Sequence, residues 1–318
     1  MTPQYSDQMD AESPGDRTTD AGSTRAGFVL LAGLPNAGKS TLLNALVGEH
    51  LSIVTPKAQT TWEKVAGIRT EARAQMVFLD TPGIVSGPQL FHRSMLAEAE
   101  RARGEADVAV GVVDGTSPGS PAEHRTLLDF LDRCPCPAAL AVNKADHARF
   151  DPEPATALAR TLKVPAFVVS ARGSTGLDPL LAFLRSNLPE SPFLYPEDDL
   201  GTAPTRYFVR ELIRETVFEN FHQEIPYSVA VRVEEFREEE DPVYIAVGLY
   251  VERKSQKGML IGKGGAGIRA VGTRARPRIE HFLGRPVYLD LWVKVWPGWR
   301  RKKEGLMAFG YRVPNDGA

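Results

Sequence analysis

Two glycine-rich segments of this chain carry residue types that hold phosphate groups. The first, GLPNAGKS at residues 33–40, has the spacing G-x-x-x-x-G-K-S between an apolar run and a helical pattern. In that setting, backbone N–H groups and a helix N-terminus point at phosphate oxygens. Lys39 is expected to reach the β- and γ-phosphates, and the Ser40 hydroxyl to bind Mg²⁺. The residues expected to line the phosphates are Gly33, Asn36, Ala37, Gly38, Lys39, Ser40 and Thr41.

A second short motif, DTPG at residues 80–83, follows another apolar run. A carboxylate at this place can orient a water on magnesium, so Asp80 is the expected indirect metal ligand, and the Gly83 N–H is expected to sense the γ-phosphate. In the segment TPKAQTTW, Thr61 is the expected switch-loop threonine that binds Mg²⁺, and Thr60 is its rival. The predicted catalytic set is Lys39, Thr61, Asp80 and Gly83, and the predicted metal set is Ser40, Thr61 and Asp80.

The residue after Gly83 is Ile84. Fast hydrolases place a glutamine there that orients the attacking water by hydrogen bonding, which an isoleucine cannot do. Slow intrinsic hydrolysis is therefore expected, with the water positioned by backbone, a bound ion or a partner.

Signals for base recognition follow later apolar runs. NKAD ends at Asp146, whose carboxylate can accept from guanine N1–H and the exocyclic amine, a pairing that adenine does not offer. Asn143 is expected to hold the loop and the base edge, and the stem of Lys144 to pack across the ring. SAR begins at Ser170, and the Ala171 N–H is expected to meet guanine O6. These motifs follow one another along the chain, each at the carboxyl end of a predicted strand, which is where open α/β sheets place their nucleotide sites. The N-terminal half is therefore predicted to bind GTP and GDP.

The second glycine-rich segment is MLIGKGGAGIRAVG at residues 259–272. It does not fit a phosphate loop, because no Ser or Thr follows its lysine and no strand leads into it. It fits the G-x-x-G turn of a KH domain, which joins two helices and clamps about four single-stranded nucleotides. A tight turn without a ligand is the alternative. The residues expected at the RNA are Ile261, Gly262, Lys263, Gly264, Gly265, Arg253, Lys257 and Arg269.

Charge is distributed unevenly along the chain. The net charge is −2 overall, but residues 250–312 contain 15 basic and 4 acidic residues, a net charge of +11. A basic block on an acidic protein suggests a polyanionic partner. The block contains the second glycine-rich segment, which favours RNA over a merely solvated surface.

The elements that would position these residues follow from hydrophobic patterning. Five short apolar runs, separated by helix-length segments, predict an α/β domain with a mostly parallel sheet and helices on both faces. The runs lie at residues 27–33, 75–80, 107–114, 138–144 and 166–171, and the helices at 39–47, 88–105, 121–133, 152–162 and 178–188. The later order of helix, two strands, two helices and strand predicts a smaller α+β domain.

The predicted organisation has four parts. Residues 1–25 are polar and rich in Pro, Gly, Ser and Thr, which is typical of a disordered tail. Residues 26–188 are expected to form the P-loop GTPase domain, 189–205 a proline-rich linker and 206–318 the α+β domain. No apolar run approaches the roughly 20 residues of a membrane-spanning helix. With only two cysteines, in RCPCP, the chain is expected in the reducing cytoplasm.

Together these motifs resemble the Era family of bacterial GTPases, over residues 26–312. The resemblance rests on GLPNAGKSTLLNALVG, KAQTTW, DTPG, NKAD and SARGSTG, and on ELIRE, EIPYSV, MLIGKGGAGI and LWVKVWPGW. It implies a G domain followed by a type II KH domain that binds single-stranded rRNA near the 3′ end of the small-subunit rRNA. It also implies a role in maturation of the small (30S) ribosomal subunit, K⁺-stimulated hydrolysis through Asn36, and peripheral association with the inner face of the cell membrane. A monomer is expected.

Three features depart from the family pattern. Trp62 stands where the family often has arginine after the paired threonines, which alters the expected switch-loop contacts. Pro277 falls inside the helix after the G-x-x-G turn and is expected to kink or break it. WRRKKE at residues 299–304 is unusually basic. Contact of this segment with rRNA or anionic lipid and a solvated helix are equal alternatives.

Two other functions remain as alternatives. One is a membrane-associated signalling GTPase whose basic domain binds lipid headgroups or a protein partner, and the other is an RNA chaperone without hydrolysis.

Overall fold

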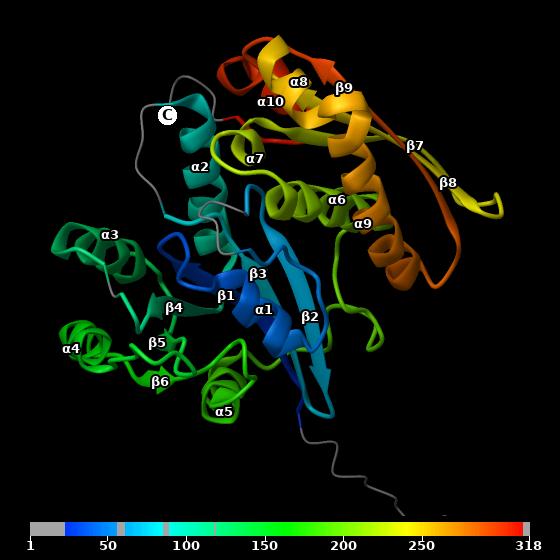
Figure 1. Cartoon of the computed structure of the whole chain (residues 1–318). Coiled ribbons are helices and arrows are strands. Elements are labelled where there is room, and N and C mark those ends of the chain that lie inside the picture. Colours follow the sequence, from blue (N-terminus) through cyan, green and yellow to red (C-terminus); the bar gives the residue numbers. More distant parts are fainter. Residues whose placement is uncertain (1–22, 56–60, 85–88, 118, 314–318) are drawn as a thin grey trace, which may run out of the picture.

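The computed structural model describes residues 23–55, 61–84, 89–117 and 119–313. The predicted tail lies outside these residues as far as residue 22, whereas Arg25 already begins strand β1. Thr60, the rival switch threonine, also lies outside them. Figure 1 shows the described elements arranged as two domains, each with its own sheet.

The larger sheet has six strands in the order β2-β3-β1-β4-β5-β6, and only its β2–β3 pair is antiparallel. Its strands are β1 (Arg25–Gly33), β2 (Val65–Glu71), β3 (Ala74–Asp80), β4 (Val108–Asp114), β5 (Ala138–Asn143) and β6 (Ala166–Val168). Each predicted apolar run overlaps one of these strands, and β1 and β3 begin one or two residues before their runs. The sequence patterns do not predict β2, because its outer half, Arg69 to Glu71, is polar and only partly buried.

Five helices cover both faces of the larger sheet (Figure 1). They are α1 (Lys39–Val47), α2 (Leu90–Glu105), α3 (Pro121–Asp132), α4 (Glu153–Leu162) and α5 (Leu177–Asn187). Helices α1 and α5 bury Leu43 and Leu181 on one face. Helices α2, α3 and α4 bury Ala99, Phe130 and Leu158 on the other. The predicted sheet with two covered faces is confirmed.

The smaller sheet has the order β7-β8-β9, with β7 and β8 antiparallel and β8 and β9 parallel. The elements of this domain are α6 (Thr205–Asn220), α7 (Ile225–Ser228), β7 (Ala230–Arg237), β8 (Val243–Val251), α8 (Lys254–Ile261), η1 (Lys263–Gly265), α9 (Ala266–Leu283), β9 (Val287–Val295), η2 (Trp299–Arg301) and α10 (Lys303–Ala308). The predicted order is present, with short helices added. None of the helices in the described part of the chain is long and apolar enough to cross a membrane.

Helix α9 continues through Pro277, so the break that was one expected outcome does not occur. Proline removes one backbone hydrogen bond and costs about 3 kcal/mol in a helix interior. Val271, Ala275 and Ile279 lie on both sides of it and are fully buried in the core of the smaller domain. Packing of this face therefore outweighs the local cost.

The segment between the domains is attached to the larger sheet. The Oε1 of Gln75, on β3, accepts from the backbone N–H groups of Leu194 (2.7 Å) and Tyr195 (3.0 Å). The Ile68 N–H of β2 donates to the Leu200 carbonyl oxygen over 2.8 Å. Gln75 is fully buried, so this segment is fixed in place along the sheet instead of hanging as a free tether.

Replacing Pro277 with alanine is expected to stabilise the protein, because α9 regains a hydrogen bond at an exposed position. The gain should be about 1–3 kcal/mol, measured as a rise in melting temperature and in the denaturant midpoint. Arg276→Ala, at the neighbouring exposed position, serves as the control and should change stability by less than about 0.5 kcal/mol. A Pro277→Ala protein no more stable than wild type would contradict this account of α9.

Candidate functional site

The loop between β1 and α1 is shaped by glycines that allow close approach. Gly38 precedes α1 with a φ of 91°, and a Cβ there would lie 2.3 Å from Asn143 Nδ2. A Cβ on Gly33 would lie 2.4 Å from the Val112 carbonyl oxygen. Only glycine fits at these two places, and the loop then turns directly into the N-terminus of α1. The first N–H groups of a helix have no partner within it, so they are available to an anion.

Lys39 is the buried cation of this loop. It is 6% exposed, and its Nζ donates to the carbonyl oxygens of Gly33 (3.2 Å) and Leu34 (3.0 Å). Burial lowers the pKa of Lys39 to about 8, and nearby Asp80 acts in the opposite direction. Phosphate oxygens at this loop would favour the charged amine in the same way as Asp80 does.

Asp80 lies at the centre of a group of hydroxyls from separate segments. Its Oδ2 accepts from Ser40 Oγ (2.6 Å), Ser52 Oγ (2.9 Å) and Thr61 Oγ1 (3.3 Å). Burial raises the pKa of Asp80, while Lys39 and these hydroxyls oppose that shift. The structure thus brings the three predicted metal-binding residues together, and adds Ser52, which belongs to no recognisable motif.

The same group suits a small, hard cation. Asp80 Oδ1 is buried and has no hydrogen-bond partner among the residues that the structure describes. Carboxylate and hydroxyl oxygens, completed by water and phosphate oxygens, are the donors that Mg²⁺ prefers. The residues present therefore fit Mg²⁺.

The predicted base-binding residues lie at and beyond the carboxyl ends of β5 and β6. Asn143 is 2% exposed, and its Nδ2 donates to the Ala37 carbonyl oxygen over 3.0 Å. This bond ties the base end of the site to the phosphate loop. Asp146 accepts from Ser170 Oγ over 2.6 Å, and that hydrogen bond lowers the pKa of Asp146. The carboxylate is therefore ionised, as recognition of guanine requires.

Two other base-end residues already have protein partners. Lys144, at a φ of 70°, places its Nζ 2.5 Å from Asp114 Oδ2. The Ala171 N–H, predicted to meet guanine O6, donates to Asn143 Oδ1 over 3.0 Å. A guanine carbonyl would have to share or displace that second bond.

Gly83 and Ile84 lie against the phosphate loop. A Cβ on Gly83 would lie 2.9 Å from Pro35 N, and the Ile84 N–H donates to the Gly33 carbonyl oxygen over 3.1 Å. Ile84 is 5% exposed and belongs to the apolar cluster of α2, α3 and α4. Its side chain packs in the interior, so it does not hold water at the site.

The G-x-x-G turn between α8 and α9 requires glycine backbone conformations. The φ angles of Gly262, Gly264 and Gly265 are 72°, 57° and 80°, and a Cβ on Gly262 would lie 2.8 Å from Gly267 N. Lys263 and Gly264 are exposed, and a Cβ on Gly264 would meet only open space. The turn therefore presents backbone to solvent at the start of α9.

The predicted RNA-binding side chains divide into two groups around this turn. Arg253 and Arg269 are exposed, and Lys257 is half-buried. Arg269 Nη2 donates to the Gly264 carbonyl oxygen over 2.6 Å, so it supports the turn from outside. Ile261 instead packs against the core of the smaller domain.

Ion pairs reduce the positive charge available beyond the turn. Arg278 Nη2 lies 2.9 Å from Glu219 Oε2, on α6. Arg300, in the WRRKKE segment, pairs with Glu252, and the preceding Trp299 is fully buried. Part of that segment is therefore packed into the domain, and the net charge of the sequence overstates the charge that is free for a partner.

Comparison with known proteins places the chain. Residues 28–144 match the family described as 50S ribosome-binding GTPase, and residues 224–300 match the KH domain family. GTPase Era of Carboxydothermus hydrogenoformans is 40% identical over 296 residues, which cover 91% of this chain and 98% of that protein. The chain belongs to the Era family of GTPases. The predicted GTPase activity and fold class, a P-loop GTPase domain followed by a smaller KH domain, are confirmed.

Further Era proteins show similar identity over about nine-tenths of the chain. GTPase Era of Nitratidesulfovibrio vulgaris is 41% identical over 298 residues, covering 90% of this chain and 97% of that protein. The structure of a tyrosine-to-alanine variant of Aquifex aeolicus Era bound to GDP·AlF₄⁻ has a TM-score of 0.86 and 35% identity, covering 91% of this chain and 100% of that one. An Era structure in complex with MgGDPNP and nucleotides 1506–1542 of 16S ribosomal RNA gives the same four values.

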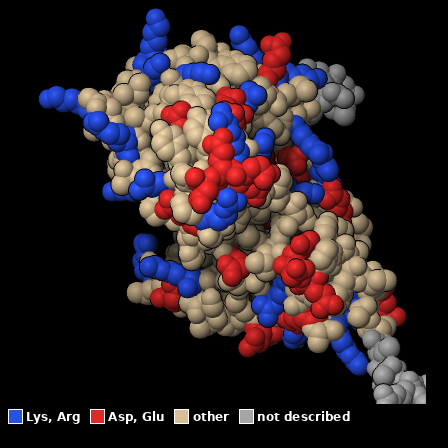
Figure 2. Space-filling model, turned by 90° about the vertical axis from the view of Figure 1, so that its right-hand side faces the viewer, with Lys and Arg blue, Asp and Glu red and all other residues tan. Residues whose placement is uncertain are grey.

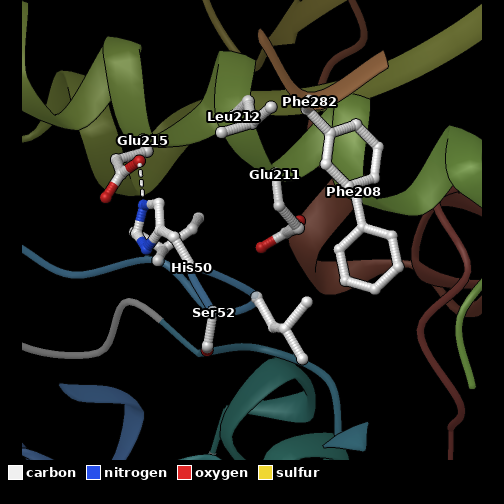
Figure 3. Close-up of a pocket in the computed structure, with 9 residues that line it drawn as sticks. His50, Ser52, Phe208, Glu211, Leu212, Glu215 and Phe282 are labelled. Carbon is white, nitrogen blue, oxygen red and sulfur yellow. Dashed lines mark hydrogen bonds and ion pairs between the residues drawn. The ribbon is translucent and has the colours of Figure 1, made fainter. Parts of the chain in front are cut away.

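One set of residues that no sequence pattern predicts holds the segment between α1 and β2, residues 50–64, against the KH domain; we call it the switch segment. Glu215 Oε2, on α6, lies 3.1 Å from His50 Nε2, and Oε1 accepts from the Val54 N–H over 3.0 Å. Figure 3 shows this pair beside a hollow between the domains, with Phe208 and Phe282 across from it. His50 belongs to no motif, and Glu215 ends the ELIRE motif, which indicates the family but not a partner for this side chain, so no local signal reveals the contact.

Replacing Asp146 with asparagine is expected to change base preference. Loss of the charged acceptor should weaken GTP binding roughly 100- to 1000-fold. Binding of XTP should strengthen, because its base has a carbonyl in place of the amine. Titration calorimetry with both nucleotides measures this, and Asp151→Asn, an exposed change nearby, is the control. An Asp146→Asn protein with wild-type GTP affinity would rule out the assigned role.

His50→Gln is expected to remove a pH-dependent part of the stability. The hydrogen bond to Glu215 raises the pKa of His50, with Glu219 acting in the same direction and burial and Arg278 against it. This stabilisation is therefore fully present below the unfolded-state pKa near 6.5 and is lost as pH rises through the folded-state value. The loss in melting temperature on mutation should be larger at about pH 6 than at about pH 8.5.

A second variant provides the control for that measurement. Glu215→Gln should remove the same pH dependence, and adding His50→Gln to it should have no further pH-dependent effect. An equal loss of melting temperature for His50→Gln at both pH values would show that the ion pair does not form.

Proposed function

We propose that this GTPase binds single-stranded rRNA of the small subunit through its KH domain, under the control of GTP, and so assists maturation of the small (30S) ribosomal subunit. The observation that carries the proposal is the G-x-x-G turn, which exposes backbone at a helix start with Lys263 and Arg269 beside it. The similar Era structure that holds nucleotides 1506–1542 of 16S ribosomal RNA supports the 3′ region of that RNA as the partner.

The nucleotide site divides its work among a few residues. Ser40 and Thr61 would hold Mg²⁺ directly and Asp80 would hold it through water, since their oxygens lie together. The MgGDPNP in a similar Era structure supports Mg²⁺ as the cofactor. Bound Mg²⁺ would supply positive charge to the phosphates. The Lys39 amine would neutralise phosphate oxygens at the loop, and the Gly83 N–H would meet the γ-phosphate.

Hydrolysis is slow in this proposal because Ile84 is buried away from the site. Backbone groups, K⁺ or bound RNA would have to position the attacking water. Asn36, whose φ of 63° places it at the bend of the phosphate loop, is the proposed contact for K⁺.

Recognition of RNA is assigned to the turn and not to the overall charge of the domain. Figure 2 shows a side of the molecule on which positive and negative side chains are interspersed, with acidic groups near its middle. A single-stranded segment is therefore expected to run along the turn, with Arg253, Lys257, Lys263 and Arg269 contacting phosphates. Such contacts weaken as salt concentration rises.

The rival function, a membrane-associated signalling GTPase, has less support. Helix α10 has only six residues, and Arg300 before it is engaged with Glu252, so the WRRKKE segment offers little free amphipathic surface. We place the protein in the cytoplasm as a monomer, with peripheral contact to the inner face of the membrane as a secondary property.

Adding negative charge to the turn should abolish RNA binding while the domain stays folded. Lys263→Glu combined with Gly264→Asp changes exposed positions, and aspartate tolerates the left-handed backbone better than most residues. Affinity for single-stranded RNA from the 3′ end of small-subunit rRNA should fall at least about 100-fold, measured by filter binding at fixed salt.

The matched control places the same charge change on the G domain, as Lys163→Glu with Gly48→Asp. It should leave RNA affinity within about twofold of wild type. Retention of wild-type RNA affinity by the turn variant would overturn the proposal, and preferential loss of binding to anionic vesicles would favour the membrane rival.

A further inference from the structure

Trp62 connects the nucleotide site to the KH domain by its position in the chain. It directly follows Thr61, which is one of the three hydroxyl residues around Asp80. Thr61 Oγ1 lies 2.8 Å from Ser40 Oγ. Trp62 itself is 3% exposed and belongs to a buried cluster built from both domains. The residue that would sense the nucleotide and the residue buried between the domains are therefore adjacent.

The indole of Trp62 is enclosed by rings from three parts of the chain. Ring centroids lie at 5.2 Å for Phe91 of α2, 5.8 Å for Tyr311, 6.3 Å for Trp299 of η2 and 6.4 Å for Phe218 of α6. The guanidinium of Arg214, on α6, lies 4.4 Å from the centre of the indole. Edge-on ring pairs and a cation over an indole face are both favourable contacts that depend on geometry.

The next residue extends the attachment. Glu63 Oε2 lies 2.8 Å from Arg210 Nη2, also on α6. Arg210 and Arg214 in turn both contact Glu211, at 3.2 Å and 2.8 Å. Thr61, Trp62 and Glu63 span at most about 10 Å, so a shift of Thr61 must move Trp62 or strain these contacts.

The switch segment is fastened to α6 at both of its described ends. Glu215 holds His50 and the Val54 N–H at the beginning, and Arg210 and Arg214 hold residues 62–63 at the end. Positions 210 and 214 are about one helical turn apart, as are 211 and 215, so these two neighbouring pairs lie on one side of α6. Residues 56–60 lie outside the described residues.

Helix α6 leads from this face to the RNA-binding turn. Ile213 and Val217 of α6 share the core of the KH domain with Val271 and Ala275 of α9. Helix α9 begins immediately after the turn, at Ala266. By contrast, the linker is fixed along the larger sheet by Gln75.

We propose that Trp62 is the positioning residue that transmits the nucleotide state to the RNA-binding domain, by direct contact with α6 and not through the linker. In this structure Thr61 lies beside Ser40 while Trp62 is enclosed, so the enclosed indole favours the arrangement that GTP and Mg²⁺ would require of Thr61. This inference rests on the proposed GTP-controlled binding of rRNA. Trp62 acts through Thr61 and α6 and does not touch the nucleotide or the RNA.

The test compares RNA affinity with a non-hydrolysable GTP analogue and with GDP, on the full chain. Coupling between sites usually changes affinity by roughly 5- to 150-fold. For Trp62→Ala the ratio of the two affinities should fall to within about twofold of one, and Trp62→Phe should retain part of it. By reciprocity, bound RNA should lose its effect on GTP affinity by the same factor.

The matched control is Trp296→Ala. Trp296 contacts Tyr250 and Phe309 within the same cluster, at 6.0 Å and 5.2 Å between ring centroids, and it is not one of the rings around Trp62. It should lower thermal stability and leave the affinity ratio at the wild-type value. A structural role for Trp62 would instead weaken RNA binding equally in both nucleotide states, which would overturn the inference.

A pair of milder variants covers the case in which Trp62→Ala does not fold. Glu63→Gln weakens the contact with Arg210 and should lower the ratio, whereas Glu71→Gln, which weakens the 2.7 Å ion pair with Arg185, should not. A full wild-type ratio in Glu63→Gln and Trp62→Phe together would overturn the inference. A ratio of one in the wild type would overturn the proposed GTP control itself, even if the RNA is bound tightly.

Discussion

The carboxylate of Asp80 is fully buried, and the hydroxyls that donate to it come from distant parts of the chain. Ser40 comes from the start of α1, and Ser52 and Thr61 come from the segment between α1 and β2. An uncompensated charge in the interior costs several kcal/mol, so these segments stay around it. The segment that carries Thr61 continues directly into Trp62, which packs on α6. Compensation of one charge therefore also helps to set where the KH domain lies.

Much of the fold follows from hydrophobic patterns, and the exceptions have physical reasons. The core strands of the larger sheet are continuous apolar runs because both of their faces are covered. Strand β2 escapes this pattern because it lies at an edge, where Arg69 to Glu71 are partly exposed. Pro277 predicts a helix break that does not occur. The unfavourable helix propensity of proline is outweighed by the packing of Val271, Ala275 and Ile279 in the core. Short helices such as α7 and η2 leave too little periodicity to be read.

The site is predictable where a motif lies at a strand end and obscure where two domains meet. The residues of the phosphate loop, DTPG, NKAD and SAR gather because parallel strands end at one edge of the sheet. His50 and Glu215 gain their roles only when α6 is placed against the G domain, across 161 to 165 positions of sequence for the two contacts of Glu215. Ser52 meets Asp80 within the G domain, but no motif marks it. Trp62 could be recognised as unusual from the sequence, but its ring partners include Trp299 and Tyr311, which no local pattern relates to it.

The cover over Trp62 has an implication for how the protein is made. Its indole is enclosed partly by Trp299 and Tyr311, which follow the RNA-binding turn in the chain. Domains generally fold in order as they leave the ribosome, so every nucleotide-binding motif emerges before these two rings do. A growing chain can thus assemble its phosphate loop before Trp299 and Tyr311 are available to pack on the indole of Trp62. Nucleotide sensing would mature late, only after translation has passed residue 311.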